Sequence, residues 1–467
     1  MATATTFGSS HFGAAQLGHK KRTECLIRIA DCIYRHPGGT LPAKFHNPKD
    51  YKAMVRLMNR PEATHAAVLA PHYERTLGLM YQPAGPVLIL HDTTELDYTG
   101  LKSITDLGSI GNGGCRGYLC HNSLAFDPER REVLGLVSQI LHCRQCVGPK
   151  ESARSKRERA SRESRLWLKG MAATGPAPAE ASRLWVHVAD RGADTYEFLA
   201  NLVQQQRSFV IRSCTDRRIH LGHKTTDSTG YVHVYARSLR LQGCRQVKVS
   251  ARAGRPARRA RVQVGFAPVL LRPPVACCGQ YERRPLPLWI VYVREIEAPA
   301  GTPPLEWFLL TDLPIKCLED AWERVSWYES RWVIEEYHKA QKTGCAIEEL
   351  QFTSSKALQP MIALLSVTAV TLLNLREASR APDAKQRPAT SVVDESDVEV
   401  LSGWRHGRTC PEWSVHDFFY ALARLGGHQN RKRDCRPGWL ILWRGWMALQ
   451  HMVDGAEAMG IKFRGQT

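Results

Sequence analysis

The sequence is short of acidic residues. It contains only 45 aspartates and glutamates against 64 lysines and arginines, which gives a formal net charge of +19. From Ser250 to Tyr281 there is no acid at all, whereas arginine recurs along the same stretch. Such a chain is either a globular protein with a basic surface or one that binds a polyanion, because each phosphate contact releases counterions. Charge alone leaves both interpretations open.

Long apolar runs are also missing. The longest, residues 361–373, is too short to cross a bilayer and is interrupted by Ser366, Thr368 and Thr371, so it predicts a buried helix. The first residues, MATATTFGSSHFG, lack the charged and then apolar segments of a secretory signal. We therefore expect a cytoplasmic protein with no membrane partner.

The 14 cysteines are then expected to be reduced thiols rather than disulfides. Two pairs of cysteines are candidates for a zinc site, Cys115 with Cys120 and Cys143 with Cys146. The first spacing is wider than zinc sites usually have, so small, half-buried thiols are the more ordinary interpretation.

Residues 1–78 have a helical and basic pattern. Leu26, Ile29 and Ile33 recur at helical spacing, and the PGG at 37–39 ends that helix. Three short apolar runs follow, at 85–92, 184–190 and 207–213, and they predict buried strands. Since helical segments lie between them, the pattern indicates an α/β protein with a mixed sheet covered by helices.

The basic segment 150–165 holds seven bases and three acids, which suits either a solvated linker or a DNA-facing loop. Near the C-terminus, Trp439, Trp443 and Trp446 recur at helical spacing. Such a stripe is more often core, but it would also suit a helical dimer contact.

Asp92 and Asp190 each end an apolar run. Side chains at the carboxyl ends of neighbouring parallel strands can converge although they lie far apart in the chain. Either residue alone could equally be a turn residue or a helix cap.

The segment 328–344 carries a third carboxylate on a patterned helix. Placed on a helix, five residues fall within an arc of roughly 80°: Tyr328, Arg331, Glu335, Lys339 and Lys342. Val333, Ile334 and Tyr337 fall on the opposite, apolar side. The charged face could hold nothing more than the ion pairs Arg331–Glu335 and Glu335–Lys339. Glu336 lies off this face and is the fallback carboxylate.

Three carboxylates without histidine or cysteine fit Mg²⁺ or Mn²⁺ better than zinc. Two such ions about 4 Å apart can bracket a scissile phosphate. The neighbouring arginine and lysines can hold adjacent phosphates.

These motifs resemble those of a known family. HDTTELDY (91–98), VADRGADTYEFL (188–199) and YESRWVIEEYHKAQKTG (328–344) resemble the three acidic motifs of the DDE transposases of the insertion-sequence-four family. The last one matches that family's Tyr-x2-Arg-x3-Glu-x6-Lys signature at Tyr328, Arg331, Glu335 and Lys342.

Three further segments share the resemblance. Residues 17–42 look like the family's domain for binding transposon ends, and RSFVIRS (207–213) looks like the strand that carries a DNA-contacting arginine, here Arg212. LEWFLLTDLP (305–314) looks like the end of the family's β-rich insertion, whose tryptophan, here Trp307, stacks on a base flipped out of the duplex. PGWLILWRGWMALQ (437–450) resembles the region through which some relatives dimerise.

The resemblance implies an RNase H-like catalytic core interrupted by a β-rich insertion and flanked by helical regions. The expected parts are a DNA-binding domain, the first part of the core, the insertion, the second part of the core, and a linker with a helical C-terminal region. Their expected bounds are 1–78, 79–214, 215–304, 305–381 and 382–467.

The implied activity is cut-and-paste transposition. Asp92, Asp190 and Glu335 would hold two Mg²⁺ ions, for which Mn²⁺ could substitute, and the DNA would pass through a hairpin intermediate before strand transfer. The DNA-contacting residues would be Tyr328, Arg331, Lys339, Lys342, Trp307 and Arg212. The implied partners are double-stranded DNA and a second copy of the chain, in the bacterial cytoplasm near the nucleoid. Two alternatives stay open, an RNase H-like nuclease that cuts without joining and an inactive end-binding repressor.

Overall fold

The computed structural model describes most of the chain, namely residues 6–145, 152, 155, 159–180, 182–220, 229–249, 257–274, 284–431, 433–461 and 463. The chain divides into two compact units. The first unit comprises residues 1–85, 93–161 and 333–467, and the second comprises residues 86–92 and 162–332. Residues 150, 151, 153, 154 and 156–158 of the basic segment 150–165 lie outside the described residues, as does Cys146.

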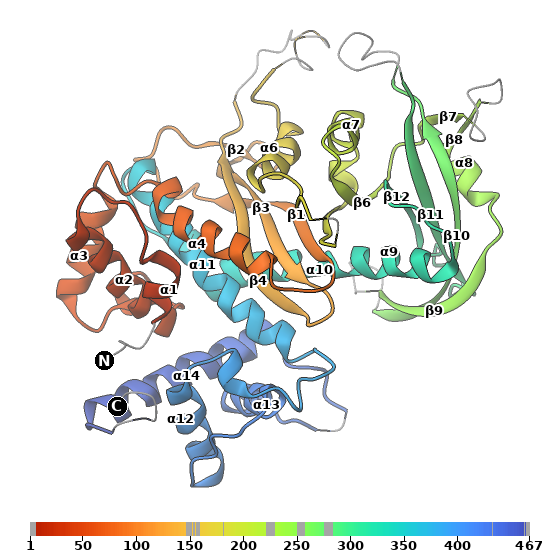
Figure 1. Ribbon diagram of the computed structural model, residues 1–467. Coiled ribbons are helices and arrows are strands. Elements are labelled where there is room, and N and C mark those ends of the chain that lie inside the picture. The colour runs from red at the N-terminus through yellow and green to blue at the C-terminus, as the bar shows by residue number, and fades with distance from the viewer. Residues whose placement is uncertain are drawn as a thin grey trace. The chain divides into compact units, whose positions relative to one another are not determined.

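The first unit is largely helical (Figure 1). Its longer helices are α1 (Phe7–Phe12), α2 (Lys20–Arg35), α3 (Pro48–Met58), α4 (His65–Met80), α11 (Ser355–Ala378), α12 (Glu395–His406), α13 (Val415–Leu425) and α14 (Trp439–Ala458). Single 3-10 turns are η1 (Pro42–Lys44), η5 (Ile347–Glu349) and η6 (Ala389–Ser391). Its strands are β2 (Gly108–Ile110), β3 (Cys115–Asp127) and β4 (Glu132–His142).

The second unit holds helices α6 (Arg165–Ala173), α7 (Tyr196–Gln204), α8 (Val232–Arg237) and α9 (Leu318–Ser330), with the 3-10 turn η2 (Arg191–Ala193). Its strands are β5 (Trp185–Ala189), β6 (Ser208–Arg212), β7 (Arg218–His220), β8 (Thr229–Tyr231), β9 (Gln242–Val249), β10 (Arg258–Leu271), β11 (Leu286–Ile296) and β12 (Glu306–Thr311). Strand β1 (Val87–Asp97) begins in the second unit and ends in the first, and helix α10 (Trp332–Lys339) does the same.

The predicted strands and the mixed sheet are confirmed. The runs at 85–92, 184–190 and 207–213 form the start of β1, β5 and β6, and each is almost fully buried. In the second unit β5 pairs in parallel with both β1 and β6, while β12 pairs antiparallel with β6. In the first unit β3 pairs antiparallel with β2 and β4. The protein is therefore a mixed α/β protein.

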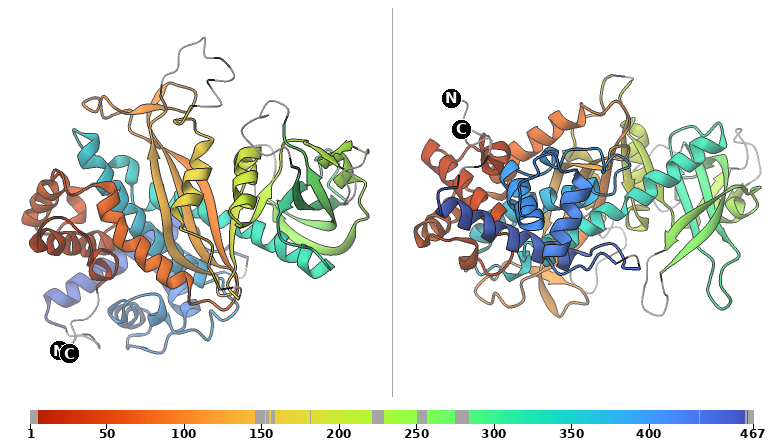
Figure 2. Two further views of the ribbon diagram at one scale, coloured as in Figure 1. Left: turned by 45° about the horizontal axis from the view of Figure 1, so that its top comes forward. Right: turned by 90° about the horizontal axis from the view of Figure 1, so that it is seen from below.

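Helices α4 and α11 cover strand β4 in the first unit (Figure 2). Helix α11 is long and apolar enough to cross a membrane by length and composition, but 83% of its apolar window is buried inside the protein. It is packed as the core helix of a globular protein is, which confirms the prediction for residues 361–373. The predicted apolar face of α2 is buried too, through Leu26, Ile29 and Ile33.

Strands β9 to β12 form the β-rich part of the second unit, with α8 and α9 against it (Figure 2). Strands β10 and β11 pair along eleven positions, from Arg261 with Ile296 to Leu271 with Leu286. Their inward residues join those of β6, β12 and α7 in one hydrophobic core. Strand β12 therefore carries Trp307 on a rigid frame.

Two buried histidines predict how stability depends on pH. Burial lowers the pKa of His121 and of His187 to about 3. The unfolded chain takes up these protons near pH 6.5, so it binds more protons than the folded protein below that value, and stability falls with falling pH. We expect the free energy of unfolding to drop by about 2 kcal/mol for each imidazole between pH 7 and pH 5. Urea unfolding at the two pH values would measure this, and equal stability at both would contradict it.

Candidate functional site

Asp92 and Asp190 lie side by side in the second unit. Strands β1 and β5 are parallel, and their register pairs Leu90 with Val188 and His91 with Ala189. The residue that follows each of His91 and Ala189 is an aspartate, Asp92 within β1 and Asp190 directly after β5. Neighbouring strands are about 4.8 Å apart, and residues in register on parallel strands point to the same face. The register therefore places the two aspartates at neighbouring positions although they are 98 residues apart in the chain.

The opposite face of the same strands carries two buried histidines, His91 and His187. His91 Nε2 lies 2.8 Å from His187 Nδ1, and both rings are buried and stacked. Successive residues of a strand point to opposite faces, so Asp92 points away from this buried pair. The aspartate side is only half-buried, and water and ligands can reach it.

The expectation that β1 ends at Asp92 is wrong. The strand continues to Asp97, and its burial changes at Asp92 from full to partial. β-Branched Thr93 and Thr94 favour extended backbone, and Thr93 Oγ1 lies 2.8 Å from Nδ1 of the buried His121. Asp92 is thus a strand residue, neither a turn residue nor a helix cap.

Asp190, by contrast, does cap a helical turn. It precedes η2, and its Oδ1 accepts a hydrogen bond of 2.7 Å from the backbone N–H of Gly192. A carboxylate has two oxygens with about four lone-pair sites, so one capping bond leaves capacity for further ligands. Capping here fixes the orientation of the side chain.

The second acid of this motif, Asp194, has a structural role. Its side chain is completely buried and forms an ion pair with Arg217. Its Oδ2 also accepts hydrogen bonds from the backbone N–H groups of Cys214, at 2.7 Å, and Thr215, at 2.8 Å. Asp194 is therefore occupied inside the protein, and Glu197 of the same motif is paired with Arg162 and Arg165, whereas Asp190 is half-buried.

A chain of contacts connects Asp92 with Trp307 within the second unit. Arg331 Nη1 lies 3.8 Å from Asp92 Oδ2, and the Arg331 guanidinium lies 5.8 Å from the ring centre of Tyr328. Tyr328 in turn meets Trp307 edge to face, with ring centres 5.2 Å apart. The structure thus brings four predicted site residues, Asp92, Arg331, Tyr328 and Trp307, into one row.

Helix α9, which carries Tyr328, is tied to the β-rich part of its unit. Arg245 on β9 donates a hydrogen bond of 2.7 Å to Ser326 and forms an ion pair with Glu329. Arg212 lies opposite Leu309 on β12 and donates to the carbonyl of Glu306 at 3.2 Å. Arg212 and Trp307 therefore lie near each other on paired strands.

The segment 328–344 does not form the single helix that its pattern predicts. Helix α9 ends at Ser330, and the N–H of its cap residue Arg331 bonds to the carbonyl of Tyr328 at 3.1 Å. After α10, residues Ala340–Gly344 form a wider π-helical turn, closed by a bond of 2.8 Å from Cys345 N–H to the Ala340 carbonyl. Tyr328, the first residue of the predicted charged face, is buried.

Within α10 itself the predicted faces are correct. Val333, Ile334 and Tyr337 are buried, whereas Glu335 is half-buried and Lys339 is exposed. Glu335 lies in the first turn of this helix, where a carboxylate is favoured by the helix dipole. Glu335, Lys339 and Lys342 belong to the first unit.

The fallback carboxylate Glu336 is committed to the interior of the first unit. It forms ion pairs with Arg376 and Lys339, both at 2.9 Å, and accepts a hydrogen bond from the indole of Trp439. Burial raises the pKa of Glu336, but the Arg376 charge and the contacts with Lys339 and Trp439 together outweigh burial, so the pKa lies below its ordinary value. Glu336 is therefore a structural residue.

The two lysines of the motif have acidic partners as well. Lys339, half exposed, reaches Glu336, and Lys342 lies 3.1 Å from Glu348. The Glu348 carboxylate also accepts a bond of 2.9 Å from the backbone N–H of Asp97. Lys342 is thus oriented by a carboxylate that also holds the end of β1.

A buried polar network beneath α10 was not predicted from the sequence. Gln139 donates to Asn122 at 2.8 Å and to Ser366 at 2.9 Å, and His338 lies 3.1 Å from Asn122. Gln341, in the π-helical turn, also donates to Ser366 at 2.9 Å. Buried polar groups need such partners, so the network fixes the rotation of α10 and of its wide turn.

Zinc binding by the cysteines finds no support. Cys115 is exposed, Cys120 is buried and Cys143 is half-buried, and none belongs to a group of possible metal ligands among the residues that the structure describes. Burial raises the pKa of Cys120 to about 12, so this thiol stays protonated.

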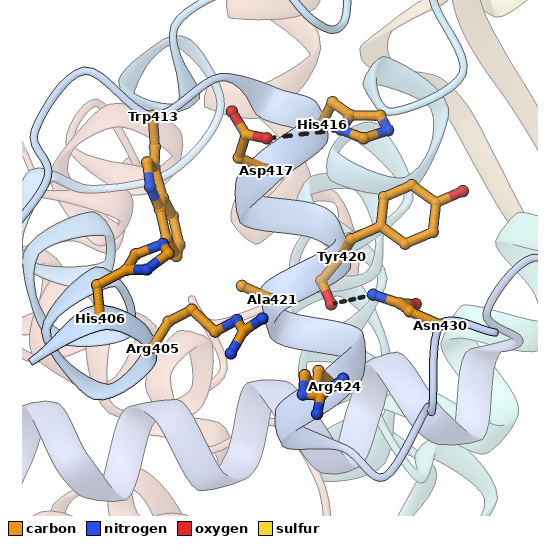
Figure 3. A pocket seen from close by; sticks show the side chains of 9 residues that line it. All are labelled: Arg405, His406, Trp413, His416, Asp417, Tyr420, Ala421, Arg424 and Asn430. Carbon is orange, nitrogen blue, oxygen red and sulfur yellow. Dashed lines mark hydrogen bonds and ion pairs between the residues drawn. The ribbon is translucent and has the colours of Figure 1, made fainter.

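A surface pocket lies between α12 and α13 in the C-terminal region (Figure 3). It is lined by Arg405, His406, Trp413, His416, Asp417, Tyr420, Ala421, Arg424 and Asn430. None of these residues belongs to the acidic motifs, so the pocket is separate from the candidate site.

A comparison of the sequence with models of known protein families found no match.

Proposed function

We propose that the protein is a DDE transposase that excises a DNA element through a hairpin intermediate and joins it to target DNA. The observation that carries this proposal is the register of β1 and β5, which sets Asp92 beside Asp190. Arg331 contacts the first of these acids, and Glu335 follows four residues later on α10. The pairing of Asp92 with Asp190 is the one that the family's first two motifs require.

The proposal includes an RNase H-like core. In the sheet β1 neighbours β3 and β5; β3 pairs antiparallel with β4, and β5 pairs in parallel with both β1 and β6. The β-rich strands are inserted between β6 and β12, which pair with each other. A core of this kind with an insertion there fits the expected order of parts along the chain.

The donor set suits magnesium. Asp92, Asp190 and Glu335 offer only carboxylate oxygens, and all three are half-buried, so water and phosphate oxygens can complete an octahedral shell. Two Mg²⁺ ions, or Mn²⁺ in their place, would supply activation of the attacking oxygen and stabilisation of the leaving oxygen.

The remaining residues would grip the DNA. The guanidinium of Arg331 has five N–H donors, enough to contact both Asp92 and a neighbouring phosphate. Trp307, half-buried and supported by Tyr328, would stack on a flipped base, which is worth roughly 1–3 kcal/mol. Lys339, Lys342 and Arg212 would hold further phosphates of a DNA duplex bound by a homodimer in the bacterial cytoplasm.

The test of this function is the product of cutting. Purified protein is incubated with duplex DNA that carries the ends of its element and with Mg²⁺, and the DNA is run on a denaturing gel. We expect ends that migrate as covalently closed hairpins. Cut ends without hairpins would identify a nuclease instead, and binding without any cut in Mg²⁺ or Mn²⁺ would identify an end-binding repressor.

Replacing Trp307 by alanine is expected to separate cutting from hairpin formation. Without the ring that holds the flipped base, the first nick should persist, while hairpins should fall about tenfold or more, in line with the loss of one base-stacking contact. The matched control is Trp404→Ala, which removes an exposed tryptophan of α12. Equal hairpin yields for Trp307→Ala and the unmodified protein would refute this role of Trp307.

A further inference from the structure

A second candidate metal centre lies in the first unit. It comprises His36, which caps the C-terminal end of α2, His46, which follows η1, and Asp454 on α14. The Nε2 atoms of His36 and His46 lie 2.6 Å and 2.8 Å from the same oxygen, Asp454 Oδ2, and 3.0 Å from each other. Three ligand atoms from three separate segments thus form a small triangle.

Hydrogen bonds alone satisfy this triangle poorly. Both imidazoles must present an N–H to bond the carboxylate oxygen, and the two hydrogens then converge on one oxygen while their nitrogens are only 3.0 Å apart. If one nitrogen is instead bare, it loses its bond to the carboxylate and two lone pairs face each other. A cation in place of both hydrogens turns every one of these contacts into coordination.

We propose that His36, His46 and Asp454 bind one Zn²⁺ ion. Two imidazoles and one carboxylate are a usual set of zinc ligands, with bonds of about 2.0–2.2 Å. Tetrahedral geometry at that length puts neighbouring ligand atoms about 3.3 Å apart, so the sides of the triangle have to widen by about 0.3 to 0.7 Å. Mg²⁺ and Ca²⁺ prefer all-oxygen sites, so imidazoles select against them. Water fills the fourth position.

The surroundings orient the ligands. Arg35 Nη1 lies 3.5 Å from the other oxygen of Asp454 and is itself paired with Glu457 at 2.7 Å. His451, one turn earlier on α14, stacks on the His36 ring with centres 5.0 Å apart. Such outer contacts hold metal ligands in place, and their loss commonly costs affinity.

The loop between the two histidines is also held in place. Lys44, which is buried, donates through Nζ to the carbonyls of Gly38 at 3.2 Å and Cys345 at 3.3 Å. His36 is likewise buried, with its side chain only 3% exposed. The fold thus holds the ligands in place before a metal ion binds, so little side-chain conformational entropy is lost on binding. A bound ion would fasten the end of α2 and the loop before α3 to helix α14.

The experiment measures zinc binding to the full-length protein. His46 is the residue to replace, because its side chain is 65% exposed and its removal leaves no cavity in the core. All proteins carry Asp190→Asn, so that the proposed magnesium site contributes little to zinc binding. Bound metal is removed from them with a chelator before the titration. Zn²⁺ is then titrated by calorimetry into this protein, into the same protein with His46→Ala, and into a matched control with His416→Ala.

We expect one Zn²⁺ per chain in the parent and in the His416→Ala control, and at least about tenfold weaker binding after His46→Ala. Co²⁺ in place of Zn²⁺ should give visible absorption bands in the parent that His46→Ala removes. If the parent binds no zinc, or if His46→Ala binds it as tightly as the parent, the three residues are only a hydrogen-bonded cluster and the proposal is overturned. Since no DNA is present, this outcome is independent of whether the protein is a transposase.

Discussion

Replacing Glu335 by glutamine is expected to reduce strand cleavage by about a thousandfold or more while the protein stays folded. The substitution preserves the shape of the side chain but removes the negative charge that a two-metal site needs. Glu335 is half-buried at the start of α10, and glutamine is as good a helix former, so stability should change little. The measurement is the rate of nicking of end-containing DNA in Mg²⁺, alongside the urea midpoint of the same variant.

The neighbouring residue provides the control. Glu336→Gln removes the charge that compensates Arg376 in the interior, and breaking a buried pair in this way costs about 3–5 kcal/mol. Glu336→Gln should therefore lower the urea midpoint clearly, whereas cleavage per folded molecule should change much less than in Glu335→Gln. If the two variants exchanged these effects, Glu336 would be the catalytic carboxylate and the assignment of Glu335 would be wrong.

Asp190→Asn is expected to abolish cleavage while end binding changes little. Asparagine can still accept the capping bond from Gly192, so η2 and the end of β5 should be preserved. What it loses is one carboxylate beside Asp92, and with it the shared site for cations. Cleavage would be followed on a gel and binding by mobility shift with the same DNA.

Asp194, four residues after Asp190, provides a control for the result that would contradict this prediction. Asp194→Asn should weaken folding, because Asp194 is the buried partner of Arg217 and of two backbone N–H groups. If Asp190→Asn lost DNA binding and cleavage together, as a destabilised Asp194→Asn protein would, then Asp190 would be structural as well.

The strands could be predicted from the sequence because each is a short, nearly continuous apolar run. Their order in the chain, combined with parallel pairing, was enough to expect that Asp92 and Asp190 meet. The end of β1 was predicted five residues too early, because the apolar run stops at Asp92 while the pairing does not. A half-buried strand segment with polar residues has the sequence pattern of a turn, and only knowledge of its neighbouring strands identifies it as a strand.

The helical motif shows the complementary limit. Periodicity correctly assigned the buried side of α10, through Val333, Ile334 and Tyr337. It could not reveal the break at Arg331 or the wide turn after Lys339, since those depend on partners such as Ser366, which accepts from Gln341. The cluster of His36, His46 and Asp454 could not be predicted from the sequence, because 418 positions separate His36 from Asp454.

The wide turn at Ala340–Gly344 has a consequence for how this protein tolerates changes of length. Removing one residue from it would restore an ordinary α-helical turn and rotate everything that follows by about 100°. Gln341 would then leave Ser366, and Cys345 would take the position of Gly344, where a side chain meets the ring of Trp443. The exposed Thr343 should accept almost any replacement, yet its deletion should be among the most damaging single changes in the chain.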